Sequence, residues 1–154
     1  MVIGFHSCGA IIVGFDDPAD CIADGFRGGA GDDRIIGGLE RDDMTGGPGA
    51  DAFAWNGNDF GVGLRTTADR ITDFSQTDGD RIDLSLIDAS TTPAGNDAST
   101  WIGPAAVSSV GGQLRCVQTG GITYVEGDRN GDRQADFAIR LDGLSALTAA
   151  DFIL

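Results

Sequence analysis

The sequence predicts an all-β fold, in which short strands of a nine-residue repeat stack into a solenoid that antiparallel β-strands cap. Three nonapeptides run in tandem over residues 28–54, and each has a large apolar residue at its eighth position. After residue 54 the repeat gives way to short β-rich stretches separated by Gly, Asn and Asp, which is typical of antiparallel strands. Because a solenoid needs a cap at its open end, we expect these strands to cover it.

The repeat follows the template G-G-x-G-x-D-x-U-x, in which U is a large apolar residue. Its copies are GGAGDDRII (28–36), GGLERDDMT (37–45) and GGPGADAFA (46–54). The preceding nonapeptide, ADCIADGFR (19–27), lacks the glycines but keeps Asp24 and Phe26 in place, and we interpret it as a degenerate first copy. The nine residues before this copy do not fit the template, so the repeat is expected to begin at residue 19. In the three intact copies the sixth position holds Asp33, Asp42 and Asp51. The eighth position holds Ile35, Met44 and Phe53.

The template has a physical basis. Its apolar residue points inward from a short strand, and the Gly-rich turn that follows needs positive φ, which glycine adopts without steric cost. A turn with few side chains exposes its carbonyl oxygens, and these form a cage of hard oxygen ligands together with the Asp carboxylate. Ca²⁺ selects such cages of roughly 6–8 oxygens. A flexible Gly/Asp-rich linker would have no reason to keep an apolar residue at every ninth position.

Composition narrows the function classes. The formal net charge is −14, and only Glu40 and Glu126 among the 24 acidic residues are not Asp. Such an acidic chain is not expected to bind nucleic acid or anionic membranes. No apolar run approaches the ~18 residues of a membrane span. The N-terminal stretch MVIGFHSCGAIIVGF lacks basic residues and is a poor signal peptide.

No catalytic constellation is predicted. His6 is the only histidine, so the chain has no HExxH motif, and no G-x-S-x-G is present. The three cysteines, Cys8, Cys21 and Cys116, show no zinc-binding spacing. Either Cys8 pairs with Cys21 or all three are free thiols. We therefore expect this chain not to be an enzyme.

These repeats resemble the RTX nonapeptides of secreted proteins of Gram-negative bacteria, which fold as a parallel β-roll. The segments downstream resemble the C-terminal domain of serralysin-type (M10) metalloproteases more than they resemble the R-modules of alginate epimerases. The resemblance covers residues 19–154, which we treat as a single domain, and leaves residues 1–18 unassigned. The segments that carry it are DRITDFSQTDGDRIDLSLID (69–88), WIGPAAV (101–107), GDRNGDRQADFAIRLDG (127–143) and LTAADFIL (147–154).

The resemblance implies several Ca²⁺ ions, each between two loops eighteen residues apart, because one coil of the roll takes two repeats. The first site would use the carbonyls of Gly28 and Ala30 with Asp33, facing the carbonyls of Gly47 and Gly49 with Asp51. The second would join Asp24 to Asp42, with the carbonyls of Gly38 and Glu40. A third would combine Gly37, Leu39 and Asp42 with an acid beyond the last repeat, such as Asp59 or Asp69.

The remaining chain offers strands and two ambiguous features. Strands are expected near 69–74, 80–87, 100–108, 113–118, 121–126 and 135–141, and a helical turn near 148–151 with Thr148 as its N-cap. Residues 128–136 carry acids at the spacing found at the start of an EF-hand loop, but Ile139 stands where that loop needs its final Glu. Two interpretations therefore remain open for this segment, a hairpin turn at Asn130–Gly131 and a cation site. Trp55 and Trp101 favour core or cap packing over a sugar-stacking platform.

As a function, the resemblance implies a secreted, extracellular calcium module that folds on binding Ca²⁺. It would be the non-catalytic C-terminal part of a serralysin-like protein. The ending DFIL resembles a type I secretion signal, so the expected partners are a type I secretion transporter and an N-terminal catalytic domain or a polysaccharide. The alternative is a carbohydrate-binding or substrate-positioning module like the epimerase R-modules, for which Arg34, Arg41 and Trp55 are the candidate residues.

Overall fold

The structure is a computed structural model, and it describes residues 2–3, 11–13, 25–39, 41–57, 65–89 and 97–154. Its regular structure is almost entirely β, since short alternating stretches are repeatedly broken by glycine. A single turn of 3-10 helix, η1 (Ala149–Asp151), precedes the last strand. The strands are β1 (Val2–Ile3), β2 (Ile11–Val13), β3 (Gly25–Arg27), β4 (Arg34–Ile36), β5 (Asp43–Thr45), β6 (Ala52–Ala54), β7 (Asp69–Ile71), β8 (Arg81–Asp83), β9 (Thr100–Trp101), β10 (Gln113–Thr119), β11 (Ile122–Asp128), β12 (Phe137–Asp142) and β13 (Phe152–Ile153).

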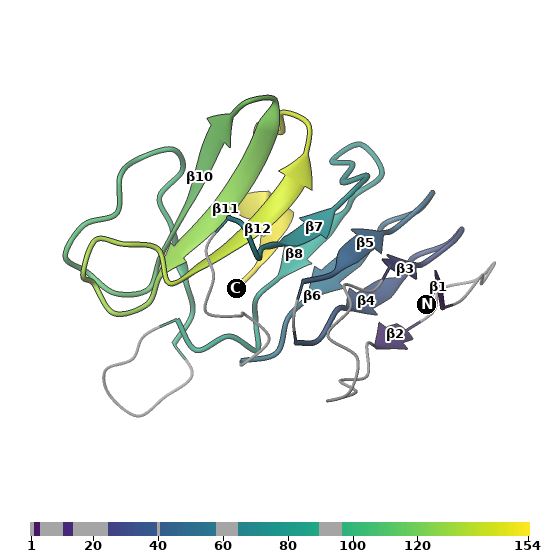
Figure 1. The fold of residues 1–154 in the computed structure, drawn as a ribbon, viewed down its shortest axis with the longest axis horizontal. Coiled ribbons are helices and arrows are strands. Elements are labelled where there is room, and N and C mark those ends of the chain that lie inside the picture. Colours follow the sequence, from purple (N-terminus) through teal and green to yellow (C-terminus); the bar gives the residue numbers. More distant parts are fainter. Residues whose placement is uncertain (1, 4–10, 14–24, 40, 58–64, 90–96) are drawn as a thin grey trace.

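The first eight strands form the roll, in which the chain passes back and forth between two sheets (Figure 1). Odd-numbered strands lie in one sheet and even-numbered strands in the other. Each strand pairs in parallel with the strand two places further along the chain, so that one coil takes two repeats. The all-β class and the parallel β-roll are therefore confirmed.

The roll extends beyond the repeats at both ends. Although the repeat was expected to begin at residue 19, β1 pairs with β3 and β2 with β4. The stretches 69–74 and 80–87 were predicted as antiparallel cap strands, and this is wrong, because they supply β7 and β8, which pair in parallel with β5 and β6. Longer loops precede these two strands, but their alternation of inward and outward residues still fits the roll.

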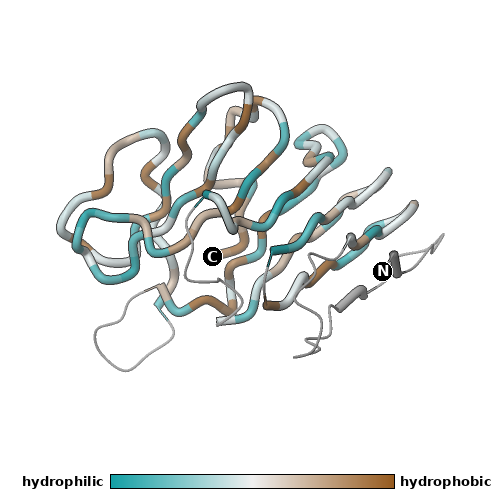
Figure 2. The backbone as a smooth tube through the Cα atoms, viewed as in Figure 1, coloured by the Kyte–Doolittle hydropathy of each residue, from teal (hydrophilic) through white to brown (hydrophobic). Residues whose placement is uncertain are grey.

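The eighth-position residues of the repeat form the core of the roll. In one sheet Phe26 pairs with Met44 and Met44 with Ile71, and in the other Ile35 pairs with Phe53 and Phe53 with Ile82. All six side chains are buried between the sheets. The tube coloured by hydropathy shows apolar residues recurring along the roll strands, as expected for inward-facing columns (Figure 2).

The cap consists of β9–β13. β10, β11 and β12 are antiparallel, as predicted for the stretches near 113–118, 121–126 and 135–141, and β12 joins the roll by pairing in parallel with β7. The stretch 100–108 yields only β9, which pairs in parallel with β10. Gly120 and Gly121 connect β10 to β11 with φ of 60° and 79°, the two positive values that a tight hairpin turn requires.

The C-terminal residues close the other sheet. β13 pairs in parallel with β8, placing Phe152 beside Ile82, and the Phe152 ring packs on Trp101 with centroids 4.6 Å apart. The predicted helical turn is confirmed as η1, and Thr148 begins it: its backbone N–H and hydroxyl donate to Asp151 Oδ2 at 2.6 and 3.1 Å. No helix in the described residues is long and apolar enough to span a membrane.

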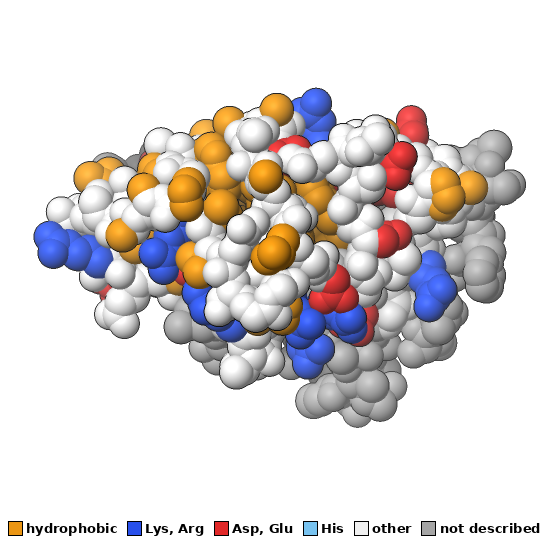
Figure 3. All heavy atoms as spheres, turned by 90° about the horizontal axis from the view of Figure 1, so that it is seen from above, with side chains coloured by type: hydrophobic (Ala, Val, Ile, Leu, Met, Phe, Trp, Pro, Cys, Tyr) orange, Lys and Arg blue, Asp and Glu red, His pale blue; other side chains and the backbone are white. Residues whose placement is uncertain are grey.

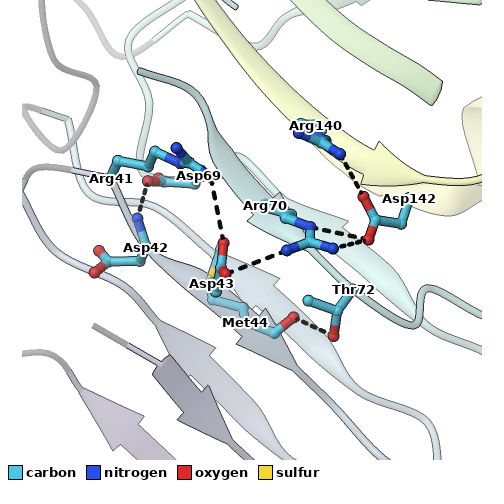
Figure 4. A network of polar contacts seen from close by, with 9 residues as sticks. All are labelled: Arg41, Asp42, Asp43, Met44, Asp69, Arg70, Thr72, Arg140 and Asp142. Atoms are coloured by element: carbon cyan, nitrogen blue, oxygen red, sulfur yellow. Dashed lines mark hydrogen bonds and ion pairs between the residues drawn. The ribbon is translucent and has the colours of Figure 1, made fainter. Parts of the chain in front are cut away.

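An ionic network joins the roll to the cap on the outer side of β5, β7 and β12 (Figure 4). Arg70 on β7 donates through Nε to Asp142 of the cap at 2.9 Å and through Nη1 to Asp43 of the roll at 3.3 Å. Arg140 pairs with the other Asp142 oxygen at 3.1 Å. Seen from above, acidic side chains lie mostly over the roll, apolar ones gather toward the cap, and Arg side chains lie over both (Figure 3).

Candidate functional site

The loops at 28–33 and 46–51 stack directly on each other along one side of the roll. The backbone N–H groups of Gly28, Gly29 and Gly31 donate to Thr45, Gly46 and Pro48, each at 2.9 Å. The four carbonyls assigned to the first cation site, those of Gly28, Ala30, Gly47 and Gly49, are not the acceptors of these bonds. These three bonds therefore pair the loops without using the oxygens that the predicted site requires.

The two glycines that open each repeat serve different purposes. The first approaches a carboxylate closely: a Cβ on Gly28 would overlap Asp33 Oδ2, and a Cβ on Gly37 would lie 2.7 Å from Asp42 Oδ2. The second adopts positive φ, with 117° at Gly29 and 103° at Gly47. Both requirements exclude side chains, which explains why the template begins with a Gly pair.

The sixth-position acids form a buried row. The backbone N–H of Asp33 donates to Asp51 Oδ1 at 2.9 Å, eighteen residues along the chain. The N–H of Asp51 donates in turn to Asp80 Oδ1 at 3.0 Å, although Asp80 belongs to no recognised repeat. The row Asp33–Asp51–Asp80 confirms that loops two repeats apart lie on the same side.

Asp51 lies at the centre of this row, where an ionised carboxylate without a bound cation is electrostatically unfavourable. It is 1% exposed, and its Oδ2 atom has no hydrogen-bond partner. Burial raises the pKa of Asp51 to about 6, against a hydrogen bond from the Asp33 N–H, and the nearby carboxylates of Asp80, Asp33 and Asp73 raise it further. Burial also raises the pKa of Asp80. A cation at this position would remove both the desolvation penalty and the mutual repulsion.

The opposite side of the roll carries a second row. The N–H of Asp42 donates to Asp69 Oδ1 at 2.9 Å, as Figure 4 shows, so Asp69 is the acid beyond the last repeat that faces Asp42. The other Asp69 oxygen accepts the indole N–H of Trp55 at 2.5 Å. Gly37, Gly38 and Leu39 belong to the loop on this side. Asp24, Glu40 and Asp59 lie outside the described residues.

Sequence reasoning missed two acids of the site. Asp80 extends the first row, and both oxygens of Asp73 accept the N–H groups of Gly46 and Gly47 at 2.9 Å. A signal for Asp80 was present in the sequence. The tripeptide Asp-Arg-Ile occurs at 33–35, 69–71 and 80–82, each time with the acid in a row and the isoleucine in the core.

The donor set fits a hard cation. No group of three or more Asp, Glu, His or Cys side chains able to hold a metal occurs in the described part of the chain. A cation between the loops would therefore take most of its oxygens from backbone carbonyls and the rest from the facing acids. Oxygen-only cages built from carbonyls and carboxylates suit Ca²⁺ rather than zinc or copper.

The ambiguous segment 128–136 forms the loop between β11 and β12. Its acids accept hydrogen bonds from the loop itself: Asp128 accepts the N–H groups of Gly131 and Arg133, and Asp136 accepts from Arg129 and Asn130. These bonds account for the acid spacing as a hairpin connection. Arg133 adopts φ of 72°, the one positive value among described non-glycine residues.

The family model described as Peptidase M10 serralysin C terminal matches residues 18–154. The chain belongs to this family. Membership agrees with the Gly-rich loops and the two carboxylate rows that the structure presents, and it confirms the resemblance inferred from the repeats and the C-terminal segments. This family forms the C-terminal, non-catalytic part of metalloproteases.

This serralysin C-terminal domain also shares its fold with a solved module. The solution structure of the AlgE6R3 subunit from the Azotobacter vinelandii mannuronan C5-epimerase aligns with a TM-score of 0.50 and 24% sequence identity. The alignment covers 98% of this chain and 80% of that chain. At this identity the likeness concerns the fold alone. No curated protein sequence matches the chain.

The residues suggested for sugar binding do not form a platform in this serralysin C-terminal domain. Trp55 is 1% exposed, so a sugar cannot stack on it, and the alternative that named it as a sugar-binding residue is wrong at this position. Trp101 packs against Phe152, which confirms core and cap packing for both tryptophans. Arg34 pairs with Asp83, and Arg41 lies 3.9 Å from Asp43. Cys116 is a free, half-buried thiol, and Cys8 and Cys21 lie outside the described residues.

Proposed function

We propose that this chain is a calcium-binding module whose roll becomes stable when Ca²⁺ binds between its stacked loops. The supporting observation is the Asp51 carboxylate. It is buried beside other acids, and one of its oxygens has no hydrogen-bond partner. A buried carboxylate in such surroundings is costly unless it is protonated or coordinates a cation. The ligands predicted for the first site all belong to the two stacked loops that carry Asp33 and Asp51, namely Gly28, Ala30, Asp33, Gly47, Gly49 and Asp51. Asp80 and Asp73 accept N–H groups of the second of these loops, which adds two carboxylates beside it.

Calcium would then be coupled to folding. Without the ion, the facing carboxylates repel each other, and the roll loses stability. An ion that binds only the folded state stabilises it by RT ln(1 + [L]/Kd), which is about 2.7 kcal/mol per independent site at a hundredfold excess over Kd. The chain is expected to be unfolded where free Ca²⁺ is scarce and folded where it is abundant.

A calcium titration of the whole chain tests this proposal. Protein treated with EGTA should give a mainly disordered far-UV circular dichroism spectrum, and Ca²⁺ should produce a β spectrum. Mg²⁺ should not replace it, because its small octahedral shell fits carbonyl cages poorly. Asp51→Asn should shift the midpoint to higher calcium, whereas Asp97→Asn, at an exposed position, should not. A spectrum that stays constant throughout the titration would refute the calcium function.

We further propose that the module acts outside the cell, after export by a type I secretion transporter that reads residues 148–154, and that it accompanies an N-terminal catalytic domain. The family membership supports this, since serralysin-type domains belong to secreted proteins. Phe152 is buried in the folded state, so the tail is fully accessible only in the unfolded chain.

Export can be separated from packing, because Ile153 and Leu154 are each 37% exposed. Replacing both by Ser should reduce export from a host that carries the transporter, while the calcium midpoint of the purified protein changes little. A matched pair of substitutions at Leu144 and Val110, which are more exposed, serves as the control. Undiminished export of the double variant at 153 and 154 would remove the basis for this signal.

A further inference from the structure

Trp55 stands where a glycine would open the next repeat. It follows β6 directly, nine residues after Gly46. At Gly28 and Gly46 the missing side chain leaves room for the carboxylate of the same repeat. At position 55 the chain instead places its largest side chain, and that side chain is fully buried. The chain therefore departs from the repeat at the position directly after β6, on the Asp42 side of the roll.

The indole N–H of Trp55 is directed at the last acid of that side. It donates to Asp69 Oδ2 at 2.5 Å, while the Asp42 N–H donates to Asp69 Oδ1 at 2.9 Å. Asp69 is buried, so both bonds act in surroundings of low dielectric, where a hydrogen bond to a carboxylate is strong. Each carboxylate oxygen has two acceptor sites, so a bond from the indole leaves a lone pair for a cation.

The two carboxylate rows end in the same way, with a different donor in each. In the first row, Asp80 is held by the N–H groups of Asp51 and Ser75 at 3.0 and 2.8 Å. In the second row, Asp69 is held by Asp42 and by Trp55. A backbone donor such as Ser75 cannot be deleted without altering the chain, but the indole donor can be removed by a single substitution.

We propose that Trp55 is a positioning residue for the cation site on the Asp42 side of the roll, an inference that rests on the proposed calcium function. Its indole N–H sets the carboxylate of Asp69 over Asp42, replacing the Gly-rich loop that presents an acid elsewhere in the roll. Removing a group that orients a metal-ligating side chain typically lowers metal affinity by about 10–100-fold. Trp55→Phe keeps an aromatic ring but loses the donor, so it should weaken this site selectively.

The test is isothermal calorimetry of Ca²⁺ binding to the full chain. Asp42→Asn and Asp51→Asn first identify which binding step belongs to each side. Trp55→Phe should lower the affinity of the Asp42 step by about tenfold or more and leave the Asp51 step unchanged. Trp101→Phe, which also removes an indole, is the matched control. In the Asp42→Asn background Trp55→Phe should have little further effect, as expected for groups that act on one site.

A second readout does not require Trp55→Phe to fold, because it follows the two indole N–H signals of the ¹⁵N-labelled wild-type protein. The signal that is missing from the spectrum of Trp101→Phe belongs to Trp101, so the remaining signal belongs to Trp55. The Trp55 signal should shift during the calcium step that Asp42→Asn abolishes. Equal weakening of both steps by Trp55→Phe, or an indole signal that follows only the Asp51 step, would overturn the inference. Absence of any calcium binding by the wild type would instead refute the proposed function.

Discussion

Arg133 is a residue whose backbone conformation opposes its side chain. Its φ of 72° lies in the left-handed region, which costs a residue with a Cβ about 1–2 kcal/mol. Arg133→Gly should therefore stabilise the protein by roughly 0.5–1 kcal/mol, after subtraction of the greater flexibility of glycine in the unfolded chain. Arg133→Ala retains the Cβ and should bring no such gain. Urea denaturation in saturating Ca²⁺ measures both, and equal stability of the two variants would contradict the explanation.

The first glycine of a repeat is a residue whose role depends on contact rather than on φ. A Cβ on Gly28 would overlap Asp33 Oδ2 and approach the Gly46 carbonyl to 2.7 Å, whereas a Cβ on Gly25 would meet nothing within 4 Å. Gly28→Ala should cost about 1–3 kcal/mol, typical of overpacking, and should also lower calcium affinity.

Gly25→Ala is the matched control, since glycine in a strand is less stable than alanine by about 0.5–1 kcal/mol. It should leave calcium affinity unchanged and slightly raise the denaturation midpoint. If the two variants behaved alike, the close approach of Gly28 to the carboxylate would not explain the repeat.

Among the elements, β7 and β12 form the junction between roll and cap, and Arg70 connects them. Hydrogen bonds from Arg70 hold the pKa of Asp142 below its usual value, although burial opposes this, and Arg140 adds to the effect. A carboxyl group with a lowered pKa in the folded state contributes stability above its unfolded pKa of about 3.9. That contribution is lost as the pH falls through the lower folded value.

Asp142→Asn should therefore destabilise the protein at pH 7, by roughly 1 kcal/mol, the upper range for partly exposed ion pairs. The difference from the wild type should shrink once the pH falls below about 4. Denaturation in saturating Ca²⁺ at several pH values checks this, with Asp97→Asn as the control for a loss of exposed charge. A difference independent of pH would show that the Arg70 ion pair contributes nothing.

The repeat elements could be predicted from sequence, but their continuation could not. Phe26, Ile35, Met44 and Phe53 were expected to face inward, and all are buried. β7 and β8 were assigned to the cap because the acid that begins β7 and the acid just before β8 lie 27 and 29 residues from their partners instead of 18. The cost of closing a loop rises only slowly with its length, so strand pairing survives such insertions. A search with a fixed period of nine residues therefore fails where the fold continues.

The candidate site was predictable to a similar extent. The stacking of Asp33 on Asp51 follows from two repeats per coil, and the structure agrees. Asp73 and Trp55 could not have been foreseen, because each reaches the site by a side-chain hydrogen bond across long sequence separations. Such contacts depend on loop conformation, which carries no periodic signal.

At the scale of the whole molecule, the last strand completes the core. Phe152 packs on Trp101 and pairs beside Ile82, so it links the ends of both sheets. Phe152→Ala should cost about 3–5 kcal/mol, as for other buried aromatic residues. Ile153→Ala, at a half-exposed position, is the control and should cost much less. Urea denaturation with Trp fluorescence measures both, and similar losses would contradict a structural role specific to Phe152.

Because one coil takes two repeats, the length of the molecule can change only in certain steps. Loss or duplication of 18 residues, the separation of Asp33 from Asp51, removes or adds one strand in each sheet and keeps every remaining acid in its own row. A change of nine residues would transfer every later strand to the opposite sheet and set the two carboxylate rows out of step. Gene duplications that lengthen or shorten such a protein are therefore expected to survive in whole coils, whereas the loops can vary one residue at a time.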